Sequence, residues 1–372
     1  MFDTCCSAAS ERGHAIARGS FYTRRVHRLF VVALTALAAP AVALTACSDS
    51  PAACDGPCDA QPRTAWQQGP AMPRRALDPG VVVLGQQIIV AGGFDTGASE
   101  GLHVTTRVEA FDLASETWGR LPDAPVAWTN SNLAVIGPTL YLAGGLDGAQ
   151  AEAQGDGYLL DPFDQAWKPI AAMPAGDARG AAGVASAPGR LYLLGGASST
   201  QVLDSCLEYN ITADAWSTLP PLPVARAHPA AMRMTDGTLI VAGGFASLDT
   251  SEPLDDVWAL PPPGAVPREW RARTPMQSKP ELEARGGCAY GVVLGELVCA
   301  GGAAGPAARN TVGSYDPYTD VWTVRESMPI DHTGTPGVAS GGRLFVPGGA
   351  ATLAREPTDT LYLYAPLDTA PR

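Results

Sequence analysis

The chain has 372 residues and a formal net charge of −12. Residues 1–47 contribute +3 to that charge, which leaves −15 for the rest of the chain. This balance argues against a nucleic-acid partner, because a polyanion is repelled by a strongly acidic protein. Only Lys168 and Lys279 are lysines, so the positive charge is almost entirely arginine, which favours fixed, planar contacts with carboxylates.

The N-terminal region has the pattern of a secretion signal. Three arginines precede the apolar run 29–34, and the apolar stretch extends to Leu44-Thr45-Ala46-Cys47. This tetrapeptide resembles the lipobox of bacterial lipoproteins, which implies a signal peptide at 1–46 and lipid attachment at Cys47. An uncleaved membrane anchor is the alternative, because about 18 apolar residues can span a bilayer.

Residues 47–63 are rich in Ser, Asp, Pro, Ala and Gly, which predicts a flexible, lipidated tether. Cys54 and Cys58 within it are spaced for a small disulfide in an oxidising compartment, with a metal loop as the weaker alternative. Ser48 lies beside Cys47, and by resemblance to enterobacterial sorting this favours the outer membrane. We therefore expect a protein anchored in the envelope of a bacterial cell, at the outer membrane or cell surface.

An apolar strand ending in a glycine doublet occurs six times in the chain, at intervals of 47 to 58 residues. The doublets are Gly92-Gly93, Gly144-Gly145, Gly195-Gly196, Gly243-Gly244, Gly301-Gly302 and Gly348-Gly349. A period of about 50 residues is the length of one propeller blade of four short antiparallel strands. The sequence therefore predicts an all-β, six-bladed propeller over residues 64–366, followed by a tail at 367–372.

One repeat shows the order of its parts. A strand at 191–194 ends at Gly195-Gly196, a second strand follows at 204–210, and Trp216 precedes a proline linker at 219–223. The same series of apolar-Gly-Gly, aromatic-Asp-Pro, Trp and Met-Pro elements recurs along the chain and resembles the Kelch family. The resemblance implies a Kelch-type propeller that works as a binding or interaction module.

The two ends of the repeat region complete one blade. After the sixth doublet only a strand at 360–364 is evident, whereas Thr64-Ala65-Trp66 has the pattern of a fourth strand. We expect this N-terminal strand to close the last blade, which removes the free sheet edges. Blade four departs from the pattern because Trp258 replaces the usual Tyr and Trp270 comes late, which leaves its strand pairing open.

Loop lengths distinguish the two faces of the predicted ring. Turns between the first and second strands of each blade are tight, whereas loops on the opposite face are long and irregular. The irregular loops are 94–103, 146–157, 245–253 and 272–284. Binding usually resides in variable loops on a rigid frame, so we expect it on this second face.

Candidate ligand-binding residues follow the proline linkers, one in each repeat. They are Arg75, Trp128, Arg179, Arg226, Arg285 and His332. Equivalent positions in a closed ring converge on its channel, where guanidinium groups and an indole suit a carboxylate-bearing ligand. The alternative is a structural role, in which these side chains donate hydrogen bonds to loop carbonyls of the neighbouring blade.

Enzymatic alternatives require residues that the sequence supplies only in part. Galactose oxidase, a Kelch-propeller enzyme, binds copper through His and Tyr, but the histidines after residue 47 lie in separate blades. We therefore expect no metal, no cofactor and no catalytic residue. The best enzymatic alternative is an enzyme that resembles the N-acetylneuraminate epimerases. That activity needs a general acid or base near the arginines, and the nearest carboxylates in the sequence are Glu281, Glu283 and Asp331. The expected partner is an unidentified protein or glycan.

Two cysteines lie on the two strands of one predicted hairpin. If Gly295-Glu296 is its turn, Cys299 faces Val292, and a disulfide with Cys288 needs a different register. We expect buried cysteines that act as small apolar residues.

Overall fold

The structure is a computed structural model that describes residues 64–96, 101–148, 151–161 and 163–367. The chain divides into two units, Met1–Asp59 and Ala60–Arg372, of which only the second contains described residues. The predicted signal peptide and tether lie outside the described residues, as does all of the predicted tail except Leu367.

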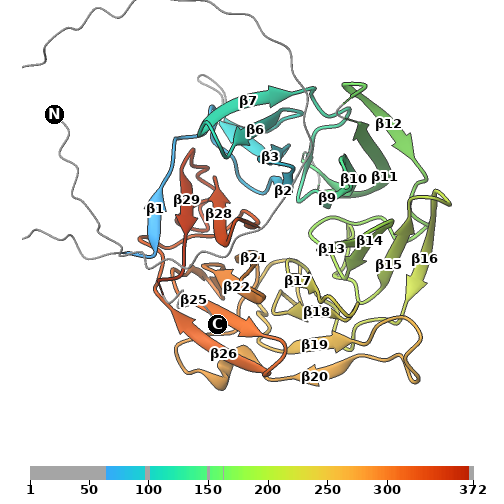
Figure 1. Cartoon of the computed structure of the whole chain (residues 1–372), viewed down its shortest axis with the longest axis vertical. Helices are drawn as coiled ribbons and strands as arrows, with labels where there is room; N and C mark the ends of the chain where they lie inside the picture. The colour runs from blue at the N-terminus through green and yellow to red at the C-terminus, as the bar shows by residue number, and fades with distance from the viewer. Residues whose placement is uncertain (1–63, 97–100, 149–150, 162, 368–372) are drawn as a thin grey trace, which may run out of the picture. The chain divides into compact units, whose positions relative to one another are not determined.

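Six four-stranded antiparallel blades form a closed ring (Figure 1). The first three blades comprise β2 (Gly80–Leu84), β3 (Gln87–Ala91), β6 (Val108–Asp112) and β7 (Thr117–Leu121); β9 (Leu133–Ile136), β10 (Thr139–Asp147), β11 (Glu152–Asp161) and β12 (Ala166–Ile170); and β13 (Gly183–Ala187), β14 (Arg190–Leu194), β15 (Cys206–Asn210) and β16 (Ala215–Leu219). The next two comprise β17 (Ala230–Arg233), β18 (Leu239–Ala242), β19 (Val257–Leu260) and β20 (Arg271–Arg273); and β21 (Ala289–Val293), β22 (Glu296–Ala300), β25 (Val312–Asp316) and β26 (Val321–Arg325). This confirms the predicted all-β, six-bladed architecture.

Short elements decorate the ring outside these blade strands. β8 (Trp128–Thr129) pairs with the end of β10, and a 3₁₀ turn spans Met276–Ser278. Two small hairpins follow the first and fifth glycine doublets: β4 (Phe94–Thr96) with β5 (Leu102–Val104), and β23 (Ala303–Ala304) with β24 (Ala307–Ala308).

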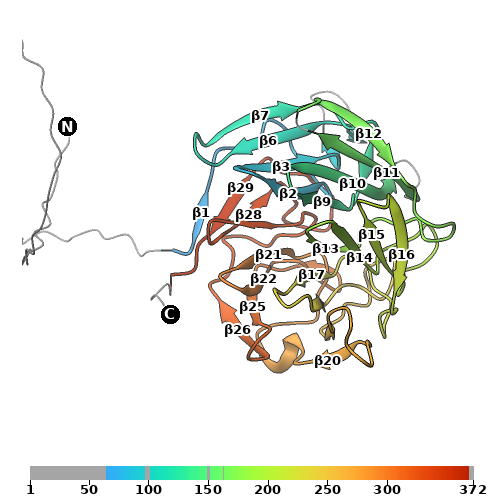
Figure 2. The same ribbon diagram turned by 45° about the vertical axis from the view of Figure 1, so that its right-hand side comes forward.

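The sixth blade is made from both ends of the ring, as the sequence predicts. It comprises β27 (Val338–Ser340), β28 (Arg343–Pro347), β29 (Leu361–Tyr364) and β1 (Trp66–Gln68). Trp66 is paired with Tyr364, and their rings pack with centroids 5.0 Å apart. Figure 2 shows β1 beside β29, so the first described strand closes the ring.

A tryptophan of each blade makes the same hydrogen bond to the linker that leaves the preceding blade. The indole Nε1 atoms donate to backbone carbonyls at 2.8 to 3.1 Å in the pairs Trp66–Glu326, Trp118–Pro70, Trp167–Pro122, Trp216–Ala171, Trp270–Pro220 and Trp322–Thr274. Trp270 makes the regular contact although it comes late in its repeat. β19 and β20 also pair, with Trp258 opposite Ala272, so blade four has normal strand pairing.

The glycine doublets lie where one blade meets the next. The first glycine of a doublet has φ of about +60 to +70°, and a Cβ there would lie 2.4 to 2.6 Å from a carbonyl oxygen leading into the next blade. The second glycine donates its N–H to the same carbonyl in five junctions, at 2.7 to 2.9 Å. No larger residue fits this contact, which explains why the doublet recurs.

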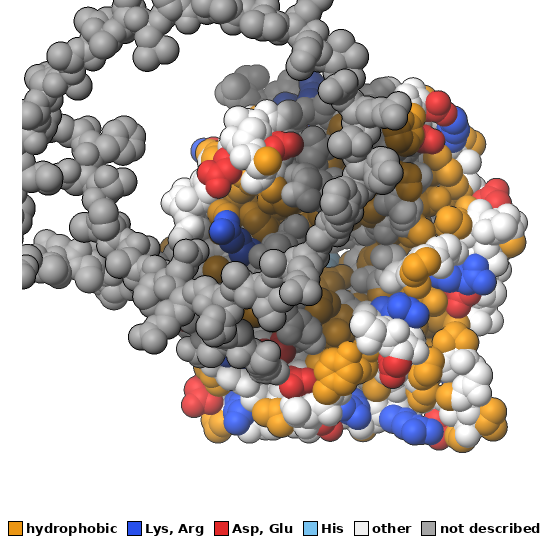
Figure 3. Space-filling model, in the orientation of Figure 1, with side chains coloured by type: hydrophobic (Ala, Val, Ile, Leu, Met, Phe, Trp, Pro, Cys, Tyr) orange, Lys and Arg blue, Asp and Glu red, His pale blue; other side chains and the backbone are white. Residues whose placement is uncertain are grey.

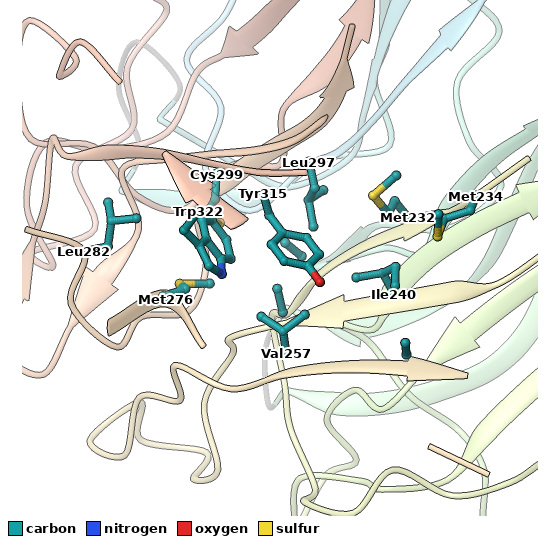
Figure 4. Packing of buried hydrophobic residues seen from close by; sticks show 14 residues of the cluster. Met232, Met234, Ile240, Val257, Met276, Leu282, Leu297, Cys299, Tyr315 and Trp322 are labelled. Atoms are coloured by element: carbon teal, nitrogen blue, oxygen red, sulfur yellow. A yellow bond between two sulfur atoms is a disulfide. The ribbon is translucent and has the colours of Figure 1, made fainter. Parts of the chain in front are cut away.

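Apolar side chains fill the wedges between blades. Between blades four and five, Met232, Ile240 and Val257 pack against Tyr315 and Trp322 (Figure 4). Both aromatic residues are almost fully buried, so this layer contributes a large share of the apolar area removed from water.

We predict that deleting residues 60–70 unfolds the ring, because β1 and its buried Trp66 are lost and β29 is left as an open edge. Loss of the Trp66 side chain alone costs about 3–5 kcal/mol, a large part of a typical folding free energy. Thermal unfolding followed by circular dichroism tests this. Deletion of residues 48–58 is the matched control, and an unchanged melting curve after the 60–70 deletion contradicts the closure.

Candidate ligand-binding bowl at the mouth of the channel

Three of the four arginines predicted at the channel mouth lie inside the blades. Arg179, Arg226 and Arg285 are 0, 0 and 1% exposed, and each donates to the carbonyl of the first glycine of its own blade's doublet at 2.9 to 3.2 Å. None of them lines a cavity at the channel. Their predicted position is therefore wrong, because the Gly-Gly carbonyls need buried donors and the guanidinium groups supply them.

Acidic and carbonyl partners occupy these guanidinium groups. Arg226 makes a bidentate pair with Asp256, at 2.6 and 3.0 Å. Arg179 donates to Asp177 Oδ1 at 2.6 Å. Arg285 donates to the backbone and hydroxyl oxygens of Thr311, and burial lowers the pKa of Arg285 to about 10. The structure thus matches the structural alternative, except that the carbonyls belong to the same blade.

The first blade uses a different arginine from the one predicted. Arg75 is exposed, whereas Arg74 is buried and donates to the Gly92 carbonyl at 2.7 Å and to Glu109 at 2.8 Å. The position equivalent to the other anchors is Ala76, whose carbonyl accepts from Gly349. Arg74 therefore reaches the doublet from two residues upstream.

Trp128 and His332 also lie away from the channel. His332 is 2% exposed, and its Nε2 donates to the Gly348 carbonyl at 2.8 Å, so it replaces an arginine in the sixth blade. Trp128 packs on Tyr158 and lines a separate cavity of about 590 Å³ beside the β4–β5 hairpin. The six predicted residues therefore do not meet at one site.

The channel is bordered instead by the residues two positions after the anchors. All six have positive φ, between +50 and +72°, and they are Asp78, Asn130, Ala181, His228, Gly287 and Gly334. Five backbone N–H···O=C bonds of 2.7 to 3.0 Å join consecutive members around the ring. We call this ring the neck. Its left-handed backbone is compatible with Asp, Asn, His and Gly, which explains four of the residue types present.

A cavity of about 580 Å³, the bowl, opens above the neck. Its apolar lining includes Leu77, Leu146, Phe245, Leu248 and Leu353. Serines, Asp249 and Arg355 also line it. Part of the lining comes from two of the irregular loops expected on this face, 146–157 and 245–253. On the face in view in Figure 3, charges of both signs are interspersed along the coloured rim of the ring.

Below the neck lies a chamber of about 80 Å³, lined by all six neck residues and by Asn132, Ser131 and Thr335. Tyr290 also lines this chamber, and its hydroxyl accepts from the Val184 N–H at 3.4 Å. Because Tyr290 belongs to blade five and Val184 to blade three, this side chain crosses the channel. The bowl and chamber together form a pocket with a tyrosine at its floor.

The neck carries two titratable groups in unusual states. Burial raises the pKa of Asp78 to about 6, although the nearby Arg355 opposes the shift. Burial lowers the pKa of His228 to about 4, so this imidazole is neutral at pH 7. A carboxylate and a neutral imidazole therefore lie on opposite sides of the ring, in blades one and four.

The hairpin of blade five corrects the cysteine prediction. Its turn is Leu294-Gly295, so Cys299 is opposite Tyr290 and not Val292. In this register Cys288 and Cys299 form a disulfide with a Cα–Cα distance of 5.6 Å. Cys206 is buried as a free thiol, as expected of a small apolar residue.

Sequence reasoning missed the neck, although the repeat contains a signal for it. Asp78, Asn130 and His228 occupy the same register two residues after the anchor positions. When the six repeats are aligned, this position contains residue types that favour the left-handed conformation in five of the six repeats.

Comparison with known proteins identifies the class of the chain. Residues 130–349 match the KLHDC2/KLHL20/DRC7 Kelch-repeats domain, and residues 75–125 match the Kelch motif. The protein belongs to the Kelch-repeat family, whose propellers are typically protein-interaction modules.

Individual relatives agree with this family. The Kelch-like protein terF of Aspergillus terreus is 25% identical over 299 residues, which cover 76% of this chain and 63% of terF. Kelch-like protein 35 of Mus musculus is 30% identical over 161 residues, covering 42% of this chain and 27% of that protein. The chain thus spans less than two thirds of these curated relatives. The solved structure titled "Structure of YjhT" shares the fold, with a TM-score of 0.67 at 15% identity, covering 81% of this chain and 98% of that one.

No helix in the described part of the chain is long and apolar enough to cross a membrane. Within the same ranges, no group of three or more His, Cys, Asp or Glu residues is arranged to hold a metal ion.

We predict that Arg226→Ala destabilises the protein by about 3 kcal/mol, because Asp256 and the Gly243 carbonyl lose their buried partner. Arg75→Ala is the control, and its exposed site predicts a change within about 0.5 kcal/mol. Urea unfolding of both variants measures the difference. Equal stability of the two variants contradicts a structural role for the buried arginine.

Proposed function

We propose that the protein is an interaction module, tethered outside the cytoplasm, whose bowl holds a segment of a protein partner. The bowl carries the proposal, because it combines a large apolar lining with a few polar groups at its base, as binding sites commonly do. Kelch-repeat propellers commonly bind protein partners, which favours a protein over a glycan.

The arginine cluster that favoured a carboxylate-bearing ligand does not form at the channel. The buried arginines are occupied within the blades, and the bowl lining holds one arginine, Arg355, together with the acidic Asp78 and Asp249. The epimerase alternative is also not favoured, because Glu281, Glu283 and Asp331 do not line the bowl. Glu283 instead accepts a hydrogen bond from Arg309 at 2.5 Å.

The tether proposal rests on the N-terminal sequence and is supported by the disulfide. Cys288–Cys299 is a pairing that persists in oxidising compartments, such as the periplasm or the cell exterior. Lipid on Cys47 then holds the propeller at a membrane, in agreement with the pattern that precedes it.

Photocrosslinking tests the binding face. We predict that benzoylphenylalanine at Leu248 or Leu353, which are 47 and 40% exposed in the bowl, gives a discrete protein adduct in the native host. The same probe at Leu294, which is 64% exposed on the opposite face, gives none. Leu353→Arg should abolish the Leu248 adduct by placing a charge in the bowl. Adducts from Leu294 alone contradict the proposed face.

Fatty-acid labelling tests the tether. We predict that Cys47→Ser loses the acyl label, because it removes the only thioether site of the lipobox. Cys54→Ser, seven residues later, should keep the label. A membrane-bound protein that carries no acyl label before any substitution would instead support the uncleaved anchor.

A further inference from the structure

The carboxylate of Asp78 has only a distant counter-charge. Its side chain is 16% exposed and lines both the bowl and the chamber. The nearest cationic atom in the described part of the chain is Nη2 of Arg355, at 3.9 Å, too far for a hydrogen bond. The pKa of about 6 leaves this carboxylate mostly ionised at pH 7, where it faces the cavity with no closer cationic partner among the described residues.

Arg355 is a weak counter-charge for this carboxylate. Its side chain is 60% exposed, and its guanidinium lies 4.8 Å from the centre of the Phe94 ring. Solvent screens such an exposed ion pair, so it compensates the charge of Asp78 only weakly. A ligand cation inside the pocket would lie in a less polar setting and interact with Asp78 more strongly.

Among the described residues that line the pocket around Asp78, Arg355 is the only arginine or lysine that would oppose such a ligand. The titratable and charged groups that face it are Arg355 and Asp249 in the bowl, His228 across the neck and Tyr290 on the floor. His228 is neutral at pH 7 because burial lowers its pKa. Asn130 and Ser131 also line the chamber and add oxygen acceptors beside the carboxylate.

We propose that the neck captures the ammonium group of a lysine side chain of the partner, with its alkyl stem against the apolar bowl and its nitrogen beside Asp78. This inference rests on the proposed function of the bowl. The chamber of about 80 Å³ suits a compact ammonium, whereas a guanidinium is wider and planar. The charge of −15 beyond residue 47 also favours a cationic partner.

Capture of a cation by Asp78 must be linked to its ionisation. The ligand binds the ionised form, so bound lysine lowers the pKa of Asp78, and affinity falls about tenfold per pH unit once the pH is below about 6. A purely apolar contact in the bowl has no such dependence.

Titration of the full chain with the peptide acetyl-Gly-Lys-Gly-amide tests the proposal, using NMR shifts to measure Kd. The matched probe replaces lysine by norleucine, which has a similar stem and no charge. In Asp78→Asn we expect the Kd for the lysine peptide to rise tenfold or more and to lose its pH dependence. Asn adopts the φ of +53° found at this position, so the neck keeps its backbone. In Arg355→Gln, which removes the competing cation, we expect tighter binding.

The outcomes separate this inference from the proposed function. Equal affinity for the lysine and norleucine peptides, or unchanged lysine affinity in Asp78→Asn, overturns the ammonium site while crosslinking from Leu248 can still support the interaction module. A lysine peptide that does not bind also overturns it. Binding that depends on Asp78 without any adduct from the bowl supports the ammonium site and counts against a protein partner.

Discussion

The contact between a glycine doublet and the backbone of the next blade is the constraint on which this propeller depends. One carbonyl of each linker lies so close to the first glycine that a Cβ would overlap it by about an ångström. The same carbonyl accepts the N–H of the second glycine in five of the junctions. This spacing brings the blades close enough for the tryptophans to reach the preceding linkers, so the doublets determine how the ring closes.

The anchor side chains stabilise the other side of that junction. Arg226 shows the arrangement: its carbonyl accepts from Gly196 of the preceding blade, while its guanidinium donates to Gly243 of its own blade. A buried carbonyl without a donor is costly, and a charge-assisted bond from a paired arginine satisfies it. Because the guanidinium groups are used in this way, the channel is left to residues farther along the linker.

Much of the fold was predictable from sequence, because it depends on a repeated backbone pattern. The period of the doublets predicted six blades, and Thr64-Ala65-Trp66 predicted the closing strand. The direction of the anchor side chains was not predictable in the same way, because the linkers are not regular strands with a two-residue alternation. The predicted turn at Gly295-Glu296 was wrong for a related reason. The turn is Leu294-Gly295, in which Leu294 adopts φ of +52°, a conformation that leucine rarely adopts.

Function in this ring depends on a difference between its symmetric backbone and its asymmetric side chains. The neck repeats one conformation six times, but only blades one, two and four place polar side chains there. Blades five and six contribute Gly287 and Gly334, which are hydrogen-bonded in the neck to His228 and Asp78, respectively. A Cβ at Gly334 would lie 2.3 Å from Leu77 Cδ1, whereas at Gly287 the nearest atom is 3.5 Å away. The neck is therefore closely packed beside Asp78, where a side chain at position 334 would collide with Leu77, and more open beside His228.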